Sequence, residues 1–294
     1  MDEKQIQDLV TAAVVEALAK QNAPTKFQPG GNRPAEELKL AKRVADWAGM
    51  PMPLPPALQN WLPDGNRAAY LGATPARLGV GRTGVRPRTD TCLTFREDHA
   101  AAKDAVSSCL DENILKQFNI VHLHSAAKDR AEFLRRPDLG RKLDAESVEK
   151  IKKTAVKGAQ VQIILVDGLS ATALNANVPT ILPLILDGLN RAGIRSGTVY
   201  AVSLGRVVVS DEVARLTGAE CSLLLVGERP GLKTAESMGG YVTYMKARNF
   251  NEAMRDVTSN IHRGGLRCEE AGPKLVEGCA KALRDRKTGV DANG

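Results

Sequence analysis

Three short apolar runs, each followed by a glycine-containing turn, constrain the fold of this chain most strongly. They cover residues 161–166, 198–203 and 221–226. Short β-branched runs bounded by turns are typical of buried strands. Apolar residues at helical spacing separate them, first over 178–189 before Gly193 and then over 211–216 before Gly218. This alternation predicts right-handed crossovers and a parallel sheet over about 160–247, with a fourth strand at 241–246.

The strand ends of such a sheet form one edge, where ligands of open α/β sheets bind. Glycines allow close backbone approach, so we expect the strand-end loops to converge on a large ligand. Tight turns alone would explain any single glycine, but three such loops together favour a binding site. The residues of this predicted edge are Gly168, Ser170, Gly205, Arg206, Gly227, Glu228 and Gly231.

Several common sites are absent from the sequence. It has no G-x-G-x-x-G after the first strand, no P-loop and no G-x-S-x-G, which disfavours nicotinamide dehydrogenases, P-loop NTPases and nucleophile-elbow hydrolases. The five cysteines include no C-x-x-C pair, and the four histidines show no metal-ligand spacing. His122 and His124 alternate on an expected strand and are interpreted as a surface pair. The sequence predicts a cradle without evident catalytic machinery.

Composition indicates an ordinary globular protein. Of its 294 residues, 43% are apolar and 26% charged. No secretory signal or membrane-spanning apolar run is present, so neither a membrane nor an exported location is expected, and the cytosol is the default. The net charge is +7, with a basic stretch at 77–88. Because no aromatic residues interleave with its arginines, a solvated basic face or an acidic partner is favoured over nucleic-acid binding.

The chain divides into four expected parts. Residues 1–20 form an amphipathic helix interpreted as a targeting or docking peptide, with an ordinary docked first helix as the alternative. Residues 21–76 form a flexible tether and a proline-rich arm, with a helical stretch at 38–47. Residues 77–158 form a mixed, mostly helical region, and residues 159–294 form the Rossmann-like domain.

Local patterns predict further elements on both sides of the sheet. Helices are expected at 95–109 and 127–134, and a third opens at the N-cap Asp144. The segment 259–265 is predicted as a polar turn before a final helix at 273–283. The arginine-rich segment 81–89 is either a loop held by its own hydrogen bonds or a contact for carboxylates or phosphates.

Several motifs together resemble the small (light) subunit of ethanolamine ammonia-lyase, in order from about Gly79 to the last helix. The motifs are Gly-Arg-Thr-Gly-Val-Arg-Pro-Arg-Thr at 81–89, Asp98-His99 with Lys103-Asp104, Arg-Pro-Asp-Leu-Gly-Arg at 136–141, Asp-Gly-Leu-Ser at 167–170, Gly-Arg-Val at 205–207, Val-Gly-Glu-Arg-Pro-Gly at 226–231 and Ser-Asn-Ile-His at 259–262.

This resemblance implies a subunit of an adenosylcobalamin-dependent carbon–nitrogen lyase that converts ethanolamine to acetaldehyde and ammonia by a radical mechanism. It implies cofactor contacts at Val207, Glu228 and Val257, where Val257 replaces a residue that is often cysteine. No catalytic residue is expected on this chain. The D-x-H-x-x-G signature of a histidine cobalt ligand is absent, so His262 is not expected to bind the metal.

The resemblance also implies partners. The catalytic barrel is expected on a large subunit, in a hetero-oligomer of six large and six small subunits, and the small subunit alone is expected to be inactive. The first helix resembles peptides that direct related chains to the shell or cargo of a bacterial microcompartment. A diol or glycerol dehydratase subunit, an assembly protein without cofactor and a nucleic-acid-binding protein are the alternatives.

Overall fold

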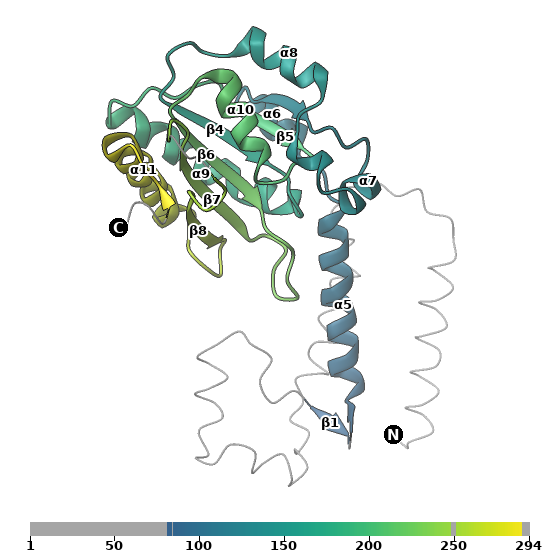
Figure 1. Ribbon diagram of the computed structural model, residues 1–294. Coiled ribbons are helices and arrows are strands. Elements are labelled where there is room, and N and C mark those ends of the chain that lie inside the picture. The colour runs from purple at the N-terminus through teal and green to yellow at the C-terminus, as the bar shows by residue number, and fades with distance from the viewer. Residues whose placement is uncertain (1–80, 84, 248–250, 290–294) are drawn as a thin grey trace, which may run out of the picture. The chain divides into compact units, whose positions relative to one another are not determined.

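The computed structural model describes residues 81–83, 85–247 and 251–289, all within one compact unit, Asn66–Gly294 (Figure 1). This part is a mixed α/β structure in which helices flank a six-stranded, mostly parallel sheet. The predicted α/β class is therefore confirmed. The expected helices at 1–20 and 38–47, the tether and the proline-rich arm lie outside the described residues.

The main sheet has the spatial order β3-β5-β4-β6-β7-β8. Its first four strands pair in parallel, whereas β6–β7 and β7–β8 pair antiparallel. The bounds are β3 Val121–His124, β4 Val161–Val166, β5 Tyr200–Ser203, β6 Cys221–Gly227, β7 Met238–Tyr244 and β8 Asp256–Ile261. Because β3 pairs with β5, the sheet spans both segments that were expected as a region 77–158 and a domain 159–294.

Two sequence predictions about this sheet were wrong. The fourth strand, expected at 241–246 in a parallel unit, is β7, and it runs antiparallel to β6 with Gly227 opposite Met238. The connection 228–237 contains no helix and is too short for the crossover that a parallel partner needs. The expected polar turn at 259–265 begins only at His262, because residues 259–261 belong to β8.

Helices cover both faces of the sheet. Alternate residues of β4 contribute to opposite cores: Ile163 packs with α9 and α11, and Ile164 packs with α8 and α10. Burial on both faces explains why β4 and β6 are apolar apart from Gln162 and Ser222, which are buried as well. The helices are α5 Thr89–Val106, α6 Glu112–Gln117, α7 Arg130–Arg135, α8 Ala145–Thr154, α9 Ala171–Arg191, α10 Val209–Thr217 and α11 Cys268–Asp285.

Most of the predicted helices exist, with shifted ends. Asp144 is the N-cap of α8, and its carboxylate accepts a hydrogen bond from the Ser147 N–H at 2.7 Å. Gly218 ends α10 in the left-handed conformation, with φ 75°. The final helix, α11, begins at Cys268, earlier than predicted, and Pro273 lies inside it, where proline removes one helical hydrogen bond.

Short elements complete the described residues. The arginine-rich segment forms a small antiparallel hairpin, β1 Arg82–Thr83 and β2 Arg86–Pro87, directly before α5. A 3-10 turn, η1, covers Leu139–Arg141. None of the described helices is both long and apolar enough to cross a membrane.

Candidate functional site at the strand ends

The carboxyl ends of β4, β5 and β6 meet at one edge of the sheet, and their loops line a pocket of about 290 Å³. The sequence-predicted Val207 and Glu228 both line this pocket, although they come from different loops. The lining residues are Gly168, Leu169, Gly205, Arg206, Val207, Val226, Gly227, Glu228, Arg229 and Tyr241. The prediction that three strand-end loops converge is confirmed.

Ser170 and Gly231, which were also expected at this edge, lie elsewhere. Ser170 is fully buried as the N-cap of α9, and its hydroxyl donates to the Ala235 carbonyl at 2.7 Å. Gly231 lines a neighbouring pocket of about 540 Å³ that shares Glu228 and Arg229 with the first. Ser170 therefore holds the β6–β7 connection in place and does not offer a polar group to the pocket.

The glycines of the edge are required by internal packing. A Cβ at Gly227 would lie 2.0 Å from the Ser170 carbonyl oxygen, and one at Gly168 would lie 2.5 Å from the Gly227 carbonyl oxygen. Gly168 also has φ +55°, which disfavours side chains. At Gly205 a Cβ would lie 2.7 Å from Val166. Close packing of the loops against one another thus explains these three glycines without a ligand.

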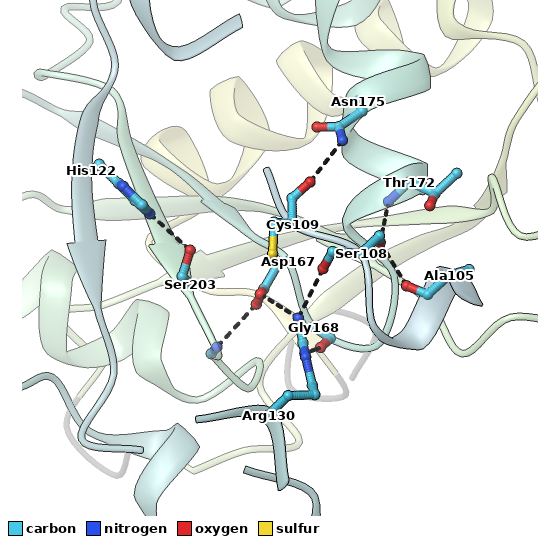
Figure 2. Close-up of polar contacts among 11 residues, drawn as sticks. Ala105, Ser108, Cys109, His122, Arg130, Asp167, Gly168, Thr172, Asn175 and Ser203 are labelled. Carbon is cyan, nitrogen blue, oxygen red and sulfur yellow. Dashed lines mark hydrogen bonds and ion pairs between the residues drawn. The ribbon is translucent and has the colours of Figure 1, made fainter. Parts of the chain in front are cut away.

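An ion pair that the sequence did not reveal joins these loops (Figure 2). The Arg130 Nη2 lies 2.9 Å from the Asp167 Oδ2, and the Arg130 Nη1 donates to the Gly168 carbonyl at 3.0 Å. Arg130 Nη2 also donates to the Ser108 carbonyl at 3.2 Å. Asp167 Oδ1 accepts from the Gly205 N–H at 3.2 Å. The pair therefore fixes the ends of β4 and β5 together.

Burial governs the electrostatics of this pair. The Asp167 side chain is only 2% exposed, and that of Arg130 is 19% exposed. Burial raises the pKa of the Asp167 carboxyl above its ordinary value, while the Arg130 charge and the backbone N–H donors oppose the rise. The one sequence signal for Asp167 was its position directly after a buried, mostly apolar strand. Arg130 carried none.

Glu228 connects three strands at the pocket. Its Oε2 accepts from the Ser237 hydroxyl at 2.6 Å, and its Oε1 accepts from the Asn260 N–H at 3.3 Å. These contacts tie the end of β6 to the start of β7 and to β8. Burial, and secondarily the Glu228 charge, raise the pKa of the neighbouring Tyr241 hydroxyl. Glu228 is thus held in a fixed position beside the pocket.

Val207 and Val257 have different surroundings. Val207 precedes α10, lines the pocket and packs partly against the core. Val257 lies on β8, is 54% exposed and does not line the pocket. Its cross-strand partner is Tyr241, which does line it. Val257 is therefore two strands away from β6, which Glu228 follows, and lies on the same face of the sheet as Tyr241.

The histidines provide no metal centre within the described residues, where no group of three or more metal-ligating side chains occurs. His262 Nε2 lies 2.9 Å from the Asn260 Oδ1, and its Nδ1 accepts from the Gly264 N–H. His122 and His124 lie on β3 with ring centroids 4.8 Å apart. His122 is half-buried, with its Nε2 2.8 Å from the Ser203 hydroxyl, so only His124 is a surface residue.

A mostly parallel sheet with a pocket at its strand carboxyl ends defines an α/β protein of the class that binds ligands at that edge. The sequence model of the family described as "Ethanolamine ammonia-lyase light chain (EutC)" matches residues 67–292. The chain belongs to this family, as the sequence motifs indicated, and is a small subunit of ethanolamine ammonia-lyase.

Relatives from several bacteria are similar to this chain over about three quarters of its length. The chain is 45% identical to the ethanolamine ammonia-lyase small subunit of Fusobacterium nucleatum over 222 residues, which cover 76% of this chain and 75% of the relative. It is 44% identical to the small subunit of Clostridium tetani over 218 residues, 74% of each chain. With the small subunit of Listeria monocytogenes, 44% identity extends over 229 residues, 77% of this chain and 78% of the relative.

Proposed function

We propose that this chain holds adenosylcobalamin at the strand-end pocket and presents it to a catalytic large subunit that deaminates ethanolamine. The convergence of Val207 and Glu228 on one pocket carries the proposal, because the resemblance named both residues and the fold brings both to the edge where α/β proteins bind ligands. Val257, on the strand beside Tyr241, is proposed as the third contact.

The residues present suit part of a corrin. Leu169, Val207 and Val226 give the pocket apolar walls, which match the hydrocarbon edge of the macrocycle. Glu228 supplies carboxylate oxygens that can accept hydrogen bonds from amide side chains of the corrin. The strand-end pocket, of about 290 Å³, would hold only one edge of so large a cofactor. The rest of the cofactor surface would be covered by another subunit.

When bound, adenosylcobalamin would supply the adenosyl radical that starts the reaction. The tasks of this chain are to orient the cofactor and to keep water from one side of it. Asp167 and Arg130 hold the loops after β4 and β5 together, and Glu228 holds the loop after β6 against β8. None of these groups needs to transfer a proton, so the substrate chemistry is assigned to the large subunit.

The assembly follows from the same proposal. The partner is a barrel-shaped large subunit, in a complex of six large and six small subunits, and this chain alone is inactive. Residues 1–20 would direct the complex to a bacterial microcompartment in the cytoplasm. A fusion of residues 1–20 to a fluorescent protein should become punctate in cells that make shells, and a diffuse signal would contradict this part.

The test of the main proposal is reconstitution. The chain is co-expressed with a large subunit, the complex is supplied with adenosylcobalamin, and acetaldehyde is measured after addition of ethanolamine. We expect co-purification and cofactor-dependent acetaldehyde formation from the complex, and none from either subunit alone. Failure of the two chains to co-purify, together with no activity, would overturn the proposal.

A further inference from the structure

The lining of the strand-end pocket contains more positive than negative side chains. Arg206 and Arg229 both line it, and Glu228 is the acidic residue among its lining. Both Glu228 oxygens already accept hydrogen bonds, from Ser237 and from the Asn260 N–H. Near the pocket, Asp167 neutralises Arg130. The charges of Arg206 and Arg229 therefore have no dedicated counter-ion among the residues that the structure describes at this edge.

Arg206 is held in a defined orientation. Its guanidinium carbon lies 4.1 Å from the centroid of the Phe133 ring, and its Nη2 donates to the Phe133 carbonyl at 3.3 Å. Its own backbone N–H donates to the Gly140 carbonyl at 2.7 Å. Phe133 is fully buried, so this platform is rigid. A guanidinium fixed by stacking loses little further freedom when it binds an anion.

The surroundings of Arg206 favour an incoming anion. Burial, together with the positive charges of Arg229 and Arg130, lowers the pKa of the Arg206 guanidinium, although it stays protonated. Its Nε is buried without a hydrogen-bond partner in the described part of the chain. Arg229 is exposed, and no hydrogen bond or ion pair of its side chain is found there. An anion beside both arginines would relieve their mutual repulsion.

We propose that Arg206 and Arg229 form an anion subsite that takes the phosphodiester of the nucleotide tail of the cofactor. The subsite rests on the proposed cobalamin function and adds to it the group that is recognised. Arginine suits phosphate because its planar fork offers two parallel N–H donors. The phosphodiester is the part of cobalamin with a full negative charge that is remote from cobalt. Glu228 and the apolar walls then face the corrin, while the arginines fix the tail.

The test compares three corrinoids on the complete complex with the large subunit. Adenosylcobalamin carries the phosphodiester and the base, adenosylcobinamide phosphate carries the phosphate alone, and adenosylcobinamide carries neither. Affinities are measured by equilibrium dialysis for the wild type and for Arg206→Met, Arg229→Met and Arg206→Lys. Arg263→Met is the matched control, because Arg263 is an exposed arginine that lines a different pocket.

We expect Arg206→Met and Arg229→Met each to weaken both phosphate-bearing ligands by roughly tenfold, as loss of a charge-assisted contact does, and to leave adenosylcobinamide unchanged. Arg206→Lys should recover part of the loss, because the charge remains. Added salt should weaken wild-type binding of the phosphate-bearing ligands more than it weakens that of the variants.

Other outcomes separate the two proposals. Equal loss for all three corrinoids would show that the arginines support the corrin or the loop, which overturns the anion subsite. No change in any variant, with normal cobalamin binding, would overturn it as well and leave the cobalamin function intact. Absence of cobalamin binding by the wild-type complex would contradict the proposed function itself. Arg229→Met makes the test independent of folding, because its side chain supports no described contact.

Discussion

Arg130 and Asp167 form a mostly buried ion pair beside the ends of β4 and β5, with the Arg130 Nη2 lying 2.9 Å from the Asp167 Oδ2. The same guanidinium binds the Gly168 and Ser108 carbonyls, and the same carboxylate accepts the Gly205 N–H. One ion pair thus determines the spacing of the β4 and β5 ends. The shape of the strand-end pocket depends on it.

Removal of Arg130 should destabilise the fold. Arg130→Met leaves the buried Asp167 carboxylate without its charged partner, and we expect a loss of about 3 kcal/mol in the free energy of unfolding, measured by urea denaturation of the full chain. The matched control is Arg136→Met, whose partner Asp138 is 59% exposed, and no measurable change is expected there. Equal stability of the two variants would contradict the structural role of the Arg130–Asp167 ion pair.

A methyl group at Gly227 should be poorly tolerated. Its Cβ would lie 2.0 Å from the Ser170 carbonyl oxygen and 2.7 Å from that of Asp167, so the backbone itself must move. We expect Gly227→Ala to cost about 3 kcal/mol of stability in thermal or urea unfolding. Gly231→Ala is the control, because its nearest atom is 3.8 Å away, and a change within about 0.5 kcal/mol is expected. Similar losses of stability in Gly227→Ala and Gly231→Ala would show that the backbone around Gly227 moves easily to make room for the methyl group.

Stability should fall on acidification because of His122. Burial, followed by the charges of His124 and Lys150, lowers the pKa of His122, whereas Glu112 opposes this. The folded protein therefore binds fewer protons than the unfolded chain below the ordinary histidine pKa of about 6.5. Stability from this group is complete above that pH and is lost as the pH falls through the window down to the folded pKa.

Substitution of His122 tests this linkage. His122→Gln removes the titrating group and keeps a polar side chain beside the Ser203 hydroxyl. Urea unfolding measured on both sides of the window should then depend less on pH than in the wild type. An undiminished pH dependence would assign the effect to another group.

Glu228 should affect cofactor binding more than folding. If its carboxylate binds corrin amides, Glu228→Gln should weaken adenosylcobalamin binding to the complex by roughly tenfold, because a charged acceptor is lost. Glu228→Ala should weaken it at least as much and should also loosen the β6 loop, since Asn260 and Ser237 lose their acceptor. Equilibrium dialysis gives the affinity, and circular dichroism checks the fold.

Ser237→Ala is the control for this loosening. It removes the hydroxyl that donates to Glu228 Oε2 but leaves the carboxylate in place, and Ser237 does not line the strand-end pocket. We expect a smaller loss of cofactor affinity than in Glu228→Gln. A loss as large as that of Glu228→Ala would mean that Glu228 acts only by holding the loop.

The sequence pattern located the centre of the sheet well. β4 occupies the predicted residues, and β5 and β6 differ from prediction only at their ends. Burial on both faces demands continuous apolar residues, which are visible without any partner strand. β8 left no such signal, because it is an edge strand with mostly exposed or half-buried residues such as Val257. The direction of β7 was indicated only by the length of its connection to β6, since residues 228–237 are too few for a parallel crossover.

The amino-acid sequence by itself determined the central strands and most of the helices, that the strand-end loops carry glycine, and to which family the chain belongs. These properties rest on local periodicity, turn chemistry and motifs in order along the chain. Only the tertiary structure decided that Arg130 reaches Asp167 across 37 positions, that Arg206 stacks on Phe133, and that Gly168 and Gly227 pack against the backbone of neighbouring loops. Such contacts join residues that are distant in sequence, so the packing of the whole sheet and its helices decides them.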